Sequence, residues 1–549
     1  MYISKIKIKN FKCYKDFSLE LNKGLNIIVG DNESGKSTIL EAINLALSGY
    51  LYGKSIWNEI SQYTFNQLSV KEYIDSVNSK HPISPPEISI EIYFKETESK
   101  IMNGDYNSDS NNNAEGFVFQ IKFNDDYASE YESLIKNNEI KSIPIEYYEV
   151  SWMTFAHDSV TTRSIPFGCI LIDSSEYKYQ NGQDLYLSKI LKNKLSNDEL
   201  VGIIQAHRRM KESFSEDKSI ISINNKLSEK SELFKDKSLK VTVDLGSKNT
   251  WESNLVTELN DIPFNYIGKG SQCMVKTDIA LLTKTSTKPQ IILLEEPENH
   301  LSHTNLNVLI NYISKEYMGN QILITTHSSF VANKLGLEKI IMLKNHVPTK
   351  FSKLSNDTYE FFKKIAGYDT LRLILSKKAI LCEGDSDELI IQKAYMQLNN
   401  EKLPIEDGIE VISTGISFLR FLEIAELSKA KVIVVTDNDG DLKALRKKYE
   451  KYLDGAYPNI HICYSTETRD GLLNKPNSPF NYNTLEPELF YANGLEKINE
   501  ILKKDFQNDE KALIHMHANK TNCALKFFDY PHKFVIPKYI EEAVTWETD

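Results

Sequence analysis

The first 48 residues alternate apolar and polar positions in an order that predicts strands followed by a helix. Residues 1–17 read MYISKIKIKNFKCYKDF, where apolar and charged residues alternate as in a half-buried strand. The apolar run LNIIV then leads into GDNESGKST and the amphipathic stretch ILEAINLAL. This order predicts a strand, a tight glycine-containing turn and a helix.

Two stretches before residue 290 lack this strand pattern. Residues 103–116, NGDYNSDSNNNAEG, are rich in Asn, Asp, Ser and Gly, which is typical of an exposed loop. From about 186 to 236 the chain is rich in Lys, Glu and Ser, with apolar residues at helical spacing. This pattern predicts helices inserted into the first domain. Sustained heptads are absent, so no long coiled-coil arm is expected.

Apolar strands return in two groups farther along the chain. The first group lies between about 290 and 327 and consists of IILLEE and QILITTH. A helix-compatible segment separates these two strands, which predicts a parallel sheet. The second group is AILCEGDSDE, IEVIST and KVIVVTDNDGD, again with helical segments between the strands. The pattern predicts an α/β fold class with two α/β units.

The predicted domain boundaries follow from where the strand pattern restarts. Residues 1–345 form the first domain, 346–376 a linking helical region, and 377–549 the second domain with a helical tail that is weakly defined after about 495. The length of 549 residues supports more than one domain, because it exceeds what one hydrophobic core usually organises.

Composition places the chain among ordinary globular proteins, with 41% hydrophobic and 26% charged residues. The N-terminus lacks the apolar core of a signal peptide, and no apolar run approaches the roughly 18 residues needed to span a bilayer. The six cysteines include no CxxC pair, which argues against a zinc ribbon or a disulfide framework. We therefore expect a cytoplasmic protein with no membrane partner.

The net charge of −11 does not exclude a DNA partner, because the local field along a groove decides nucleic-acid binding. It does require a confined basic patch. The best candidate is residues 515–538, a segment that begins at His515 and contains four lysines, His517, His532 and several aromatic residues. On charge alone, a solvated helix face explains this segment equally well. The four lysines are Lys520, Lys526, Lys533 and Lys538.

The turn GDNESGKS fits the phosphate-binding pattern GxxxxGK[ST]. Its glycines let backbone N–H groups wrap the phosphates, while the following helix N-terminus adds partial positive charge. Lys36 is expected to neutralise the β and γ phosphates, and Ser37 to offer its hydroxyl to Mg²⁺. The alternative is a glycine-rich turn without function. The position of the motif between an apolar strand and a helix disfavours this alternative. The predicted nucleotide-binding residues here are Gly30, Asn32, Ser34, Gly35, Lys36, Ser37 and Thr38.

The strand IILLEE ends in two adjacent carboxylates that suggest two roles. Glu295 is expected to hold the Mg²⁺ hydration shell, and Glu296 to polarise the attacking water. Paired carboxylates at a strand end are otherwise often plain solvated residues. The next apolar strand leads to His327, which is placed to reach the γ-phosphate, and this order favours the functional interpretation.

These motifs resemble the SMC-like ABC ATPases, the branch that includes recombination and repair ATPases and the OLD-family nucleases. The resemblance covers about residues 1–345 and implies ATP as cofactor. It also implies a homodimer, in which a signature motif from the opposite protomer closes over the nucleotide. Asn299 and His300 match the segment that usually crosses the dimer interface, whereas Lys269 stands where family signatures usually carry Ser. The candidate signature residues that contact ATP are Lys269, Gly270, Ser271 and Gln272.

Carboxylates also follow the strands of the second unit. Glu383 ends one strand and is followed by Asp387, while DNDGD places Asp437 and Asp439 at the end of another. Strand ends converge at the carboxyl edge of a parallel sheet, so a site for Mg²⁺ or Mn²⁺ is expected there. A calcium-binding EF-hand loop is excluded, because Leu442 stands where that loop needs Gly.

Glu at one strand end and Asp-x-Asp at a later one resemble the Toprim fold, over about residues 376–525. Fusion to an SMC-like ATPase is similar to the OLD family specifically. The resemblance implies a two-metal nuclease centre in which Glu383 and Lys520, from NKTNCALKF, have catalytic roles. Topoisomerases, by contrast, need a catalytic tyrosine in a separate domain, and many primases need zinc-binding cysteines. The implied metal ligands are Glu383, Asp387, Asp437, Asp439 and Glu486.

The resemblance implies an ATP-regulated, metal-dependent DNA endonuclease that nicks or cleaves DNA, usually in antiphage defence. Relatives act alone, with a helicase, or with a reverse transcriptase and its reverse-transcribed DNA, and the sequence does not select among these or between a dimer and a higher oligomer. The alternative is a non-cleaving, ATP-switched DNA clamp. The intact carboxylate set disfavours it.

Overall fold

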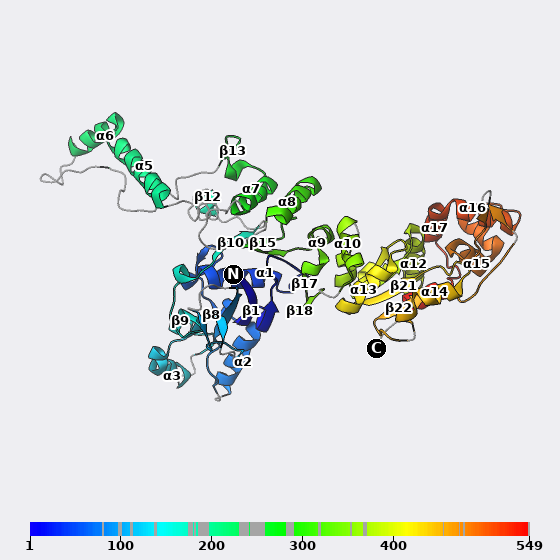
Figure 1. The fold of residues 1–549 in the computed structure, drawn as a ribbon, viewed down its shortest axis with the longest axis horizontal. Coiled ribbons are helices and arrows are strands. Elements are labelled where there is room, and N and C mark those ends of the chain that lie inside the picture. The colour runs from blue at the N-terminus through cyan, green and yellow to red at the C-terminus, as the bar shows by residue number, and fades with distance from the viewer. Residues whose placement is uncertain are drawn as a thin grey trace. The chain divides into compact units, whose positions relative to one another are not determined.

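The computed structural model divides the chain into two compact units, which are described separately below (Figure 1). The first unit consists of Met1–Ile28 and Gly35–Thr326, and the second of Val29–Ser34 and His327–Asp549. The structure describes residues 1–79, 82–96, 102–109, 113–136, 140–173, 179–180, 183–184, 197–229, 241, 258–281, 290–316, 320–351, 354–365, 370–453, 455–471, 473–475 and 478–546.

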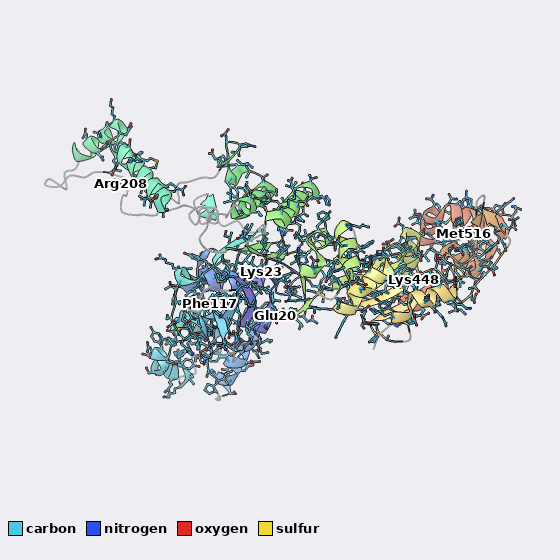
Figure 2. The ribbon with its side chains drawn as sticks, viewed as in Figure 1. Glu20, Lys23, Phe117, Arg208, Lys448 and Met516 are labelled. Carbon is cyan, nitrogen blue, oxygen red and sulfur yellow. The ribbon has the colours of Figure 1, made fainter. Side chains whose placement is uncertain are left out.

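An antiparallel sheet forms from the alternating sequence at the N-terminus and from four later strands. Its order is β2-β1-β6-β8-β7, with β9 paired to β8. Ile6 and Ile8 of β1 are fully or almost fully buried while Lys7 between them is partly exposed, because successive side chains point to opposite faces. Phe117 on β8 is also buried (Figure 2). The strands are β1 (Tyr2–Phe11), β2 (Tyr14–Glu20), β6 (Ile88–Lys95), β7 (Asn103–Gly104), β8 (Ala114–Phe123) and β9 (Tyr148–Thr154).

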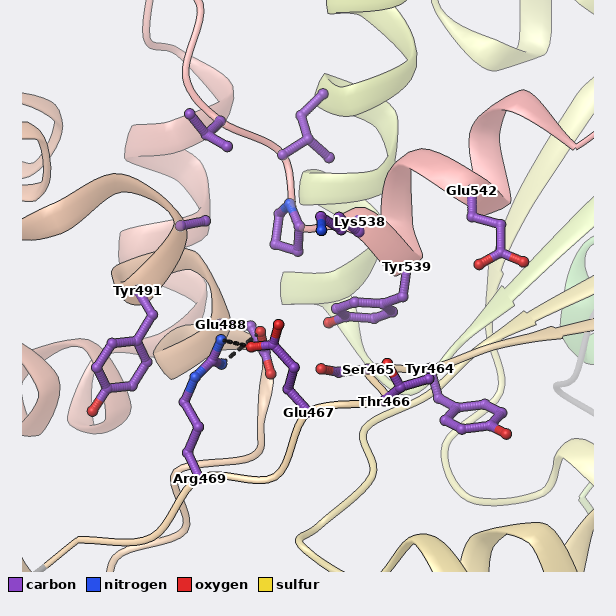
Figure 3. A pocket seen from close by; sticks show the side chains of 14 residues that line it. Tyr464, Ser465, Thr466, Glu467, Arg469, Glu488, Tyr491, Lys538, Tyr539 and Glu542 are labelled. Atoms are coloured by element: carbon purple, nitrogen blue, oxygen red, sulfur yellow. Dashed lines mark hydrogen bonds and ion pairs between the residues drawn. The ribbon is translucent and has the colours of Figure 1, made fainter.

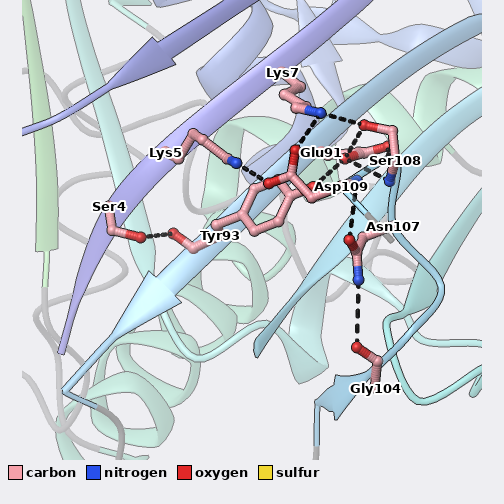
Figure 4. Close-up of polar contacts among 9 residues, drawn as sticks. All are labelled: Ser4, Lys5, Lys7, Glu91, Tyr93, Gly104, Asn107, Ser108 and Asp109. Atoms are coloured by element: carbon pink, nitrogen blue, oxygen red, sulfur yellow. Dashed lines mark hydrogen bonds and ion pairs between the residues drawn. The ribbon is translucent and has the colours of Figure 1, made fainter. Parts of the chain in front are cut away.

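The predicted exposed loop at 103–116 is partly wrong. Asn103 and Gly104 pair with the start of β8, and the backbone N–H and hydroxyl of Ser108 donate to the carboxylate of Glu91. Asp109 forms ion pairs with the ammonium groups of two lysines on β1 (Figure 4). Charge and hydroxyl contacts thus fasten this segment to the sheet. Composition alone does not reveal such partners, which lie far away in the sequence.

A second sheet of mostly parallel strands carries the phosphate-binding turn. Its order is β10-β15-β16-β3-β17-β18, and β10, β15, β16 and β3 pair in parallel. Every residue of β3 and β16 is buried, as expected for parallel strands covered on both faces. The predicted parallel pairing of the two apolar strands between 290 and 327 is confirmed. The strands are β3 (Leu25–Gly30), β10 (Gly168–Asp173), β15 (Gln290–Glu295), β16 (Gln321–Thr325), β17 (Ile340–Lys344) and β18 (Val347–Lys350).

Helices connect and flank these strands. The predicted inserted helices include α5 and α6, whereas residues 186–196 and 230–236 lie outside the described residues. The helices of this part are α1 (Lys36–Ser48), α2 (Gln67–Asn78), α3 (Ala128–Lys136), α5 (Asn197–Ser215), α6 (Lys218–Glu229), α7 (Lys269–Leu281), α8 (His303–Glu316) and α9 (Ser329–Leu335). Short hairpins are β4 (Tyr50–Leu51) with β5 (Lys54–Ser55), β11 (Tyr179–Gln180) with β12 (Gln183–Asp184), and β13 (Glu258–Leu259) with β14 (Ile262–Pro263).

The second unit contains a four-stranded parallel sheet in the order β20-β19-β21-β22. Its strands are β19 (Lys378–Cys382), β20 (Ile409–Ser413), β21 (Lys431–Val435) and β22 (Ile460–Cys463), and a short hairpin joins β23 (Asn474–Lys475) to β24 (Ser478–Pro479). Its helices after α9 are α10 (Asn356–Lys364), α11 (Thr370–Leu375), α12 (Asp385–Leu398), α13 (Phe418–Ser428), α14 (Leu442–Lys448), α15 (Leu485–Leu502), α16 (Asp509–Ala518), α17 (Lys520–Phe528) and α18 (Lys538–Thr545).

The expected tail after about 495 is helical as predicted, but it is not weakly defined. Helices α15 to α18 share one hydrophobic core with β19 and β21, to which Phe527 and Ile540 contribute buried side chains. Met516 belongs to the same core (Figure 2). The core extends to Val544, beyond the expected end of the Toprim resemblance near 525. Sequence periodicity underestimates these helices because they are short, and short helices depend on tertiary packing for stability.

Among the described residues, no helix combines the length and the apolar character required to cross a membrane.

Candidate nucleotide and metal sites

The phosphate-binding turn has a backbone that only glycine adopts without strain. Gly35 has φ of 97°, and a Cβ atom at this position would collide with the phenol of Tyr14. Helix α1 begins at the next residue, and the side chain of Lys36 is buried. The backbone carbonyl of Ser34 lies 3.1 Å from Nδ1 of His346, a contact that the motif did not indicate. This backbone conformation is compatible with the phosphate-binding role that the motif predicts.

The strand register brings the other candidate nucleotide residues to the same sheet edge. In parallel pairing, Glu295 at the end of β15 lies opposite Thr325 at the end of β16, which in turn lies opposite Ile28 of β3. His327 follows β16 after one intervening residue. Ligands of open α/β sheets bind outside the carboxyl ends of their strands, so these residue positions fit a nucleotide site.

The carboxylate of Glu296 is held by its own loop. Glu296 has a positive φ of 40°, and its backbone N–H donates to the carbonyl of Thr325 at 3.0 Å. Nδ2 of Asn299 donates to Oε2 of Glu296 at 2.8 Å. The sequence had suggested Asn299 only as an interface residue. In this structure it orients the candidate general base.

The candidate signature lies inside the first turn of α7, because α7 begins at Lys269. Gly270 approaches the loop after β15 so closely that an added Cβ would lie 2.6 Å from the carbonyl of His300. Nε2 of Gln272 donates to the carbonyls of Phe264 and Ile267 at 2.9 and 3.2 Å. This amide group thus has a structural role that the motif did not predict.

Four carboxylates form an electrostatically coupled cluster at the carboxyl edge of the second unit's sheet, which we call the acidic cluster: Glu383, Asp387, Asp437 and Glu486. Burial, with the charges of Glu383 and Glu486, raises the pKa of Asp387 to about 7. Burial, with the charges of the other three, also raises the pKa of Asp437 well above its usual range. A divalent cation would offset this repulsion, and carboxylate oxygens are the donors that a hard cation prefers. The cluster is nevertheless open, because no three of its carboxylates place one oxygen each within 4.8 Å of the others.

Neighbouring polar groups orient the acidic cluster. Oγ1 of Thr436 donates to Oε1 of Glu383 at 2.8 Å, and the backbone N–H of Gly384 donates to Oδ2 of Asp387 at 3.2 Å. Nζ of Lys520 lies 3.1 Å from Oε2 of Glu486, whose side chain is 4% exposed. The structure therefore brings Lys520 to the cluster.

Asp439 is placed differently from the four cluster residues. It is exposed and accepts a hydrogen bond at 2.8 Å from Nδ2 of Asn481. Its charge nevertheless contributes to the raised pKa of Asp437. Asn438, between the two aspartates, is buried and donates Nδ2 to the carbonyls of Ser465 and Glu467. The Asp-x-Asp turn is thereby joined to the segment that follows β22.

That segment forms one wall of a cavity of about 420 Å³ (Figure 3). Tyr539 also lines the cavity, and the nearby charges of Asp437 and Asp387, after burial, raise its pKa. Across the cavity, Nη1 of Arg469 lies 2.8 Å from Oε2 of Glu488, two residues beyond the cluster's Glu486. The cavity therefore adjoins the acidic cluster. No motif pointed to it, because its wall comes from three separated segments.

The predicted basic patch at 515–538 is only partly exposed to solvent. Its four lysines are exposed, but the aromatic residues between them, such as Phe527, Tyr530 and Phe534, belong to the hydrophobic core. They cannot stack on nucleotide bases as they stand. Electrostatic contact with a phosphate backbone remains open to the lysines.

Comparison with known proteins gives the family. A family model described as an AAA ATPase domain matches residues 1–332. The chain belongs to this family. The Toprim domain of proteins like the overcoming lysogenization defect (OLD) protein matches residues 374–439, so the chain is an OLD-family fusion of an ATPase to a Toprim domain. The predicted fold class is thereby confirmed.

Curated relatives match short stretches of this OLD-family chain. The DNA replication and repair protein RecF of Acetivibrio thermocellus is 51% identical over 49 residues, 9% of this chain and 13% of RecF. The structural maintenance of chromosomes protein 6 of Saccharomyces cerevisiae is 54% identical over 46 residues, 8% of this chain and 4% of that protein. The matches thus span a small part of these relatives.

Solved structures of SMC heads and RecF are also similar to the OLD-family chain. An Smc head bound to the C-winged helix domain of ScpA covers 63% of this chain and 97% of its own, with 16% identity and a TM-score of 0.33. The match to a RecF–ATP structure covers 64% of this chain and 99% of the RecF chain, with 13% identity and a TM-score of 0.34.

Proposed function

We propose that this protein is an ATP-regulated, metal-dependent DNA endonuclease. The observation that carries the proposal is the acidic cluster with Lys520 beside it, at the carboxyl edge of a Toprim sheet in a chain that also contains an ATPase domain. Glu486 is buried and the other three carboxylates are partly buried, and holding four such groups together costs stability unless a cation or a proton compensates for their charge. Such a cost is typical of functional sites.

Glu383, Asp387, Asp437 and Glu486 would hold Mg²⁺ or Mn²⁺, with Asp439 at the exposed side. Bound cations supply an activated water and stabilise the leaving 3′ oxygen. The protein's own side chains orient the metal-binding carboxylates and neutralise charge on the phosphate. Thr436 fixes the carboxylate of Glu383 through its hydroxyl, and Lys520 offsets negative charge that builds on the phosphate in the transition state.

The ATPase part would bind ATP through the residues of the phosphate-binding turn. Lys36 neutralises the β and γ phosphates, and Ser37 with Glu295 holds the accompanying Mg²⁺. Glu296 accepts a proton from the attacking water, and Asn299 keeps its carboxylate in place. His327 contacts the γ-phosphate, and Lys269, Gly270 and Ser271 close over ATP from a second copy of the chain. A homodimer and a cytoplasmic location remain predictions.

The cavity beside the acidic cluster supports DNA as the substrate. It offers Lys538 and the aromatic ring of Tyr491, and the Arg469 guanidinium lies 4.7 Å from the centroid of that ring. Arg469 is ion-paired with Glu467 and Glu488, so a phosphate would have to displace one of these carboxylates. Phosphates and bases bind groups of these kinds. We propose that nucleotides flanking the scissile phosphate occupy this cavity.

Supercoiled plasmid tests the function directly. Purified protein with Mg²⁺ or Mn²⁺ should convert it to the nicked or linear form, and ATP should change the rate. Plasmid that stays supercoiled with both metals, with and without ATP, contradicts nuclease activity of the isolated protein. ATP-dependent plasmid binding in that same sample would instead support the non-cleaving clamp. Cleavage only after adding a helicase, or a reverse transcriptase with its DNA product, would identify a required partner in antiphage defence.

A further inference from the structure

A second group of candidate metal ligands lies on the edge strand of the Toprim sheet. His461 and Cys463 are two residues apart on β22, so their side chains point to the same face of the sheet. Helix α18 packs against β21 and β22 and contributes Glu542. One potential ligand atom from each of these three residues lies within 4.8 Å of the other two. Among the described residues, no other group of three His, Cys, Asp or Glu meets this criterion.

The three side chains are already oriented toward one another. Nε2 of His461 lies 2.7 Å from Oε1 of Glu542, and the imidazole stacks on the indole of Trp546 with an interplanar angle of 5°. Nζ of Lys378 donates to the carbonyl of Trp546 at 2.7 Å, which fixes the end of α18. Preorganised ligands lose little conformational entropy when a cation binds.

We propose that His461, Cys463 and Glu542 bind a thiophilic divalent cation such as Zn²⁺, which fastens α18 to β22. Imidazole nitrogen, thiolate sulfur and carboxylate oxygen together are the ligands of zinc sites, whereas Mg²⁺ and Ca²⁺ prefer oxygen alone. The site shares no residue with the acidic cluster. Three protein ligands leave a fourth tetrahedral position for water.

The buried thiol of Cys463 must release its proton when a cation binds. Cys463 is 1% exposed, and burial together with the charge of Glu542 raises the pKa of its thiol. A divalent cation would displace the thiol proton and offset the carboxylate charge at the same time. An entry path exists, because Glu542 also lines the cavity of about 420 Å³ (Figure 3).

Cobalt absorption tests the site independently of nuclease activity. The full-length protein is treated with a chelator and titrated with Co²⁺ while excess Mg²⁺ saturates the acidic cluster. We expect a thiolate-to-cobalt charge-transfer band that grows to one equivalent and disappears when Zn²⁺ is added. Cys463→Ser should abolish the band. Cys523→Ser is the matched control, because Cys523 is also buried in this unit but outside the group, and it should retain the band.

A second variant keeps the test valid if Cys463→Ser does not fold. Glu542→Gln replaces an exposed ligand, retains a hydrogen-bonding group for His461, and should weaken Co²⁺ binding by more than the roughly tenfold cost of losing an outer-shell partner. Zn²⁺ should also raise the unfolding temperature of the wild type more than that of Glu542→Gln. A wild-type protein without the charge-transfer band, or Co²⁺ affinity unchanged by Glu542→Gln, would show that His461 and Glu542 form only a structural hydrogen bond.

Discussion

At the residue scale, the ionisation of Asp387 links the acidic cluster to stability. Its folded pKa of about 7 exceeds the ordinary 3.8, so the folded state binds more protons than the unfolded state between these values. Without metal, this carboxyl therefore lowers stability progressively as pH rises from about 4 to about 7, and the full cost persists at higher pH. Divalent cations should reverse the effect, because they bind the ionised form.

Asp387→Asn should accordingly raise the unfolding temperature of the metal-free protein, and by more at about pH 8 than at about pH 5. A change of 1 kcal/mol corresponds to roughly 2–4 °C in a unit of this size. Calorimetry with chelator and then with saturating Mg²⁺ measures both states. With Mg²⁺ present, the unfolding temperature of the variant should no longer exceed that of the wild type. An equal effect at both pH values would contradict the raised pKa.

Glu296 and Asn299 give a second prediction at this scale. Glu296→Gln should retain ATP but slow its hydrolysis by about 10²-fold to 10⁴-fold, because the general base is lost. Asn299→Ala should slow ATP hydrolysis by about 10-fold to 100-fold, since the Glu296 carboxylate is present but poorly oriented. Lys36→Ala should instead weaken ATP binding itself. Nucleotide affinity and turnover, measured separately, distinguish the three variants. Wild-type turnover in Glu296→Gln with loss in Glu295→Gln would reverse the assigned roles.

At the element scale, the turn between β3 and α1 depends on Gly35. Gly35→Ala should lose nucleotide binding and destabilise the fold by more than the roughly 1–2 kcal/mol that a left-handed backbone costs, because the added methyl also collides with Tyr14. Gly53→Ala is the matched control: φ is 75°, but no atom lies within 4 Å of the added Cβ. It should show only the backbone cost and bind nucleotide normally. Thermal unfolding and nucleotide titration provide the measurements.

At the scale of the whole molecule, the two candidate centres lie on different sheets and should be separable by mutation. Asp437→Ala should abolish plasmid nicking with ATP hydrolysis largely retained, because removing one carboxylate loosens the cations of the acidic cluster without affecting the Mg²⁺ near Ser37. Normal nicking by this variant would refute the Toprim centre. Plasmid gels and phosphate release from the same protein sample compare the two activities.

Lys520→Ala should separate charge neutralisation from metal binding within the nuclease centre. We expect nicking to slow by about 10²-fold, while cation affinity measured by calorimetry does not fall, because the lysine repels cations. Lys526→Ala is the control, since Lys526 is an exposed lysine on the same helix, α17. Weakened metal binding in Lys520→Ala would instead indicate that its ion pair shapes Glu486.

The sequence alone determined the features that depend on short-range pattern. The strand, turn and helix around Lys36, the paired carboxylates at the end of β15, and the strand-end positions of Glu383 and Asp437 all follow from apolar periodicity and residue spacing. Parallel strand order then places such residues at one edge. The resemblance added Glu486 and Lys520, and the structure brings both to the acidic cluster.

Only the tertiary structure decided the contacts between residues far apart in the chain. The bonds from Thr436 to Glu383 and from Asn299 to Glu296, the burial that raises the pKa of Asp387, and the approach of Glu542 to His461 have no signature in local spacing. Helices α15 to α18 also enter the core although their sequence suggested a weakly defined tail. The physical reason is that burial and side-chain partners arise from packing between segments, whereas periodicity reports only how one segment faces its surroundings.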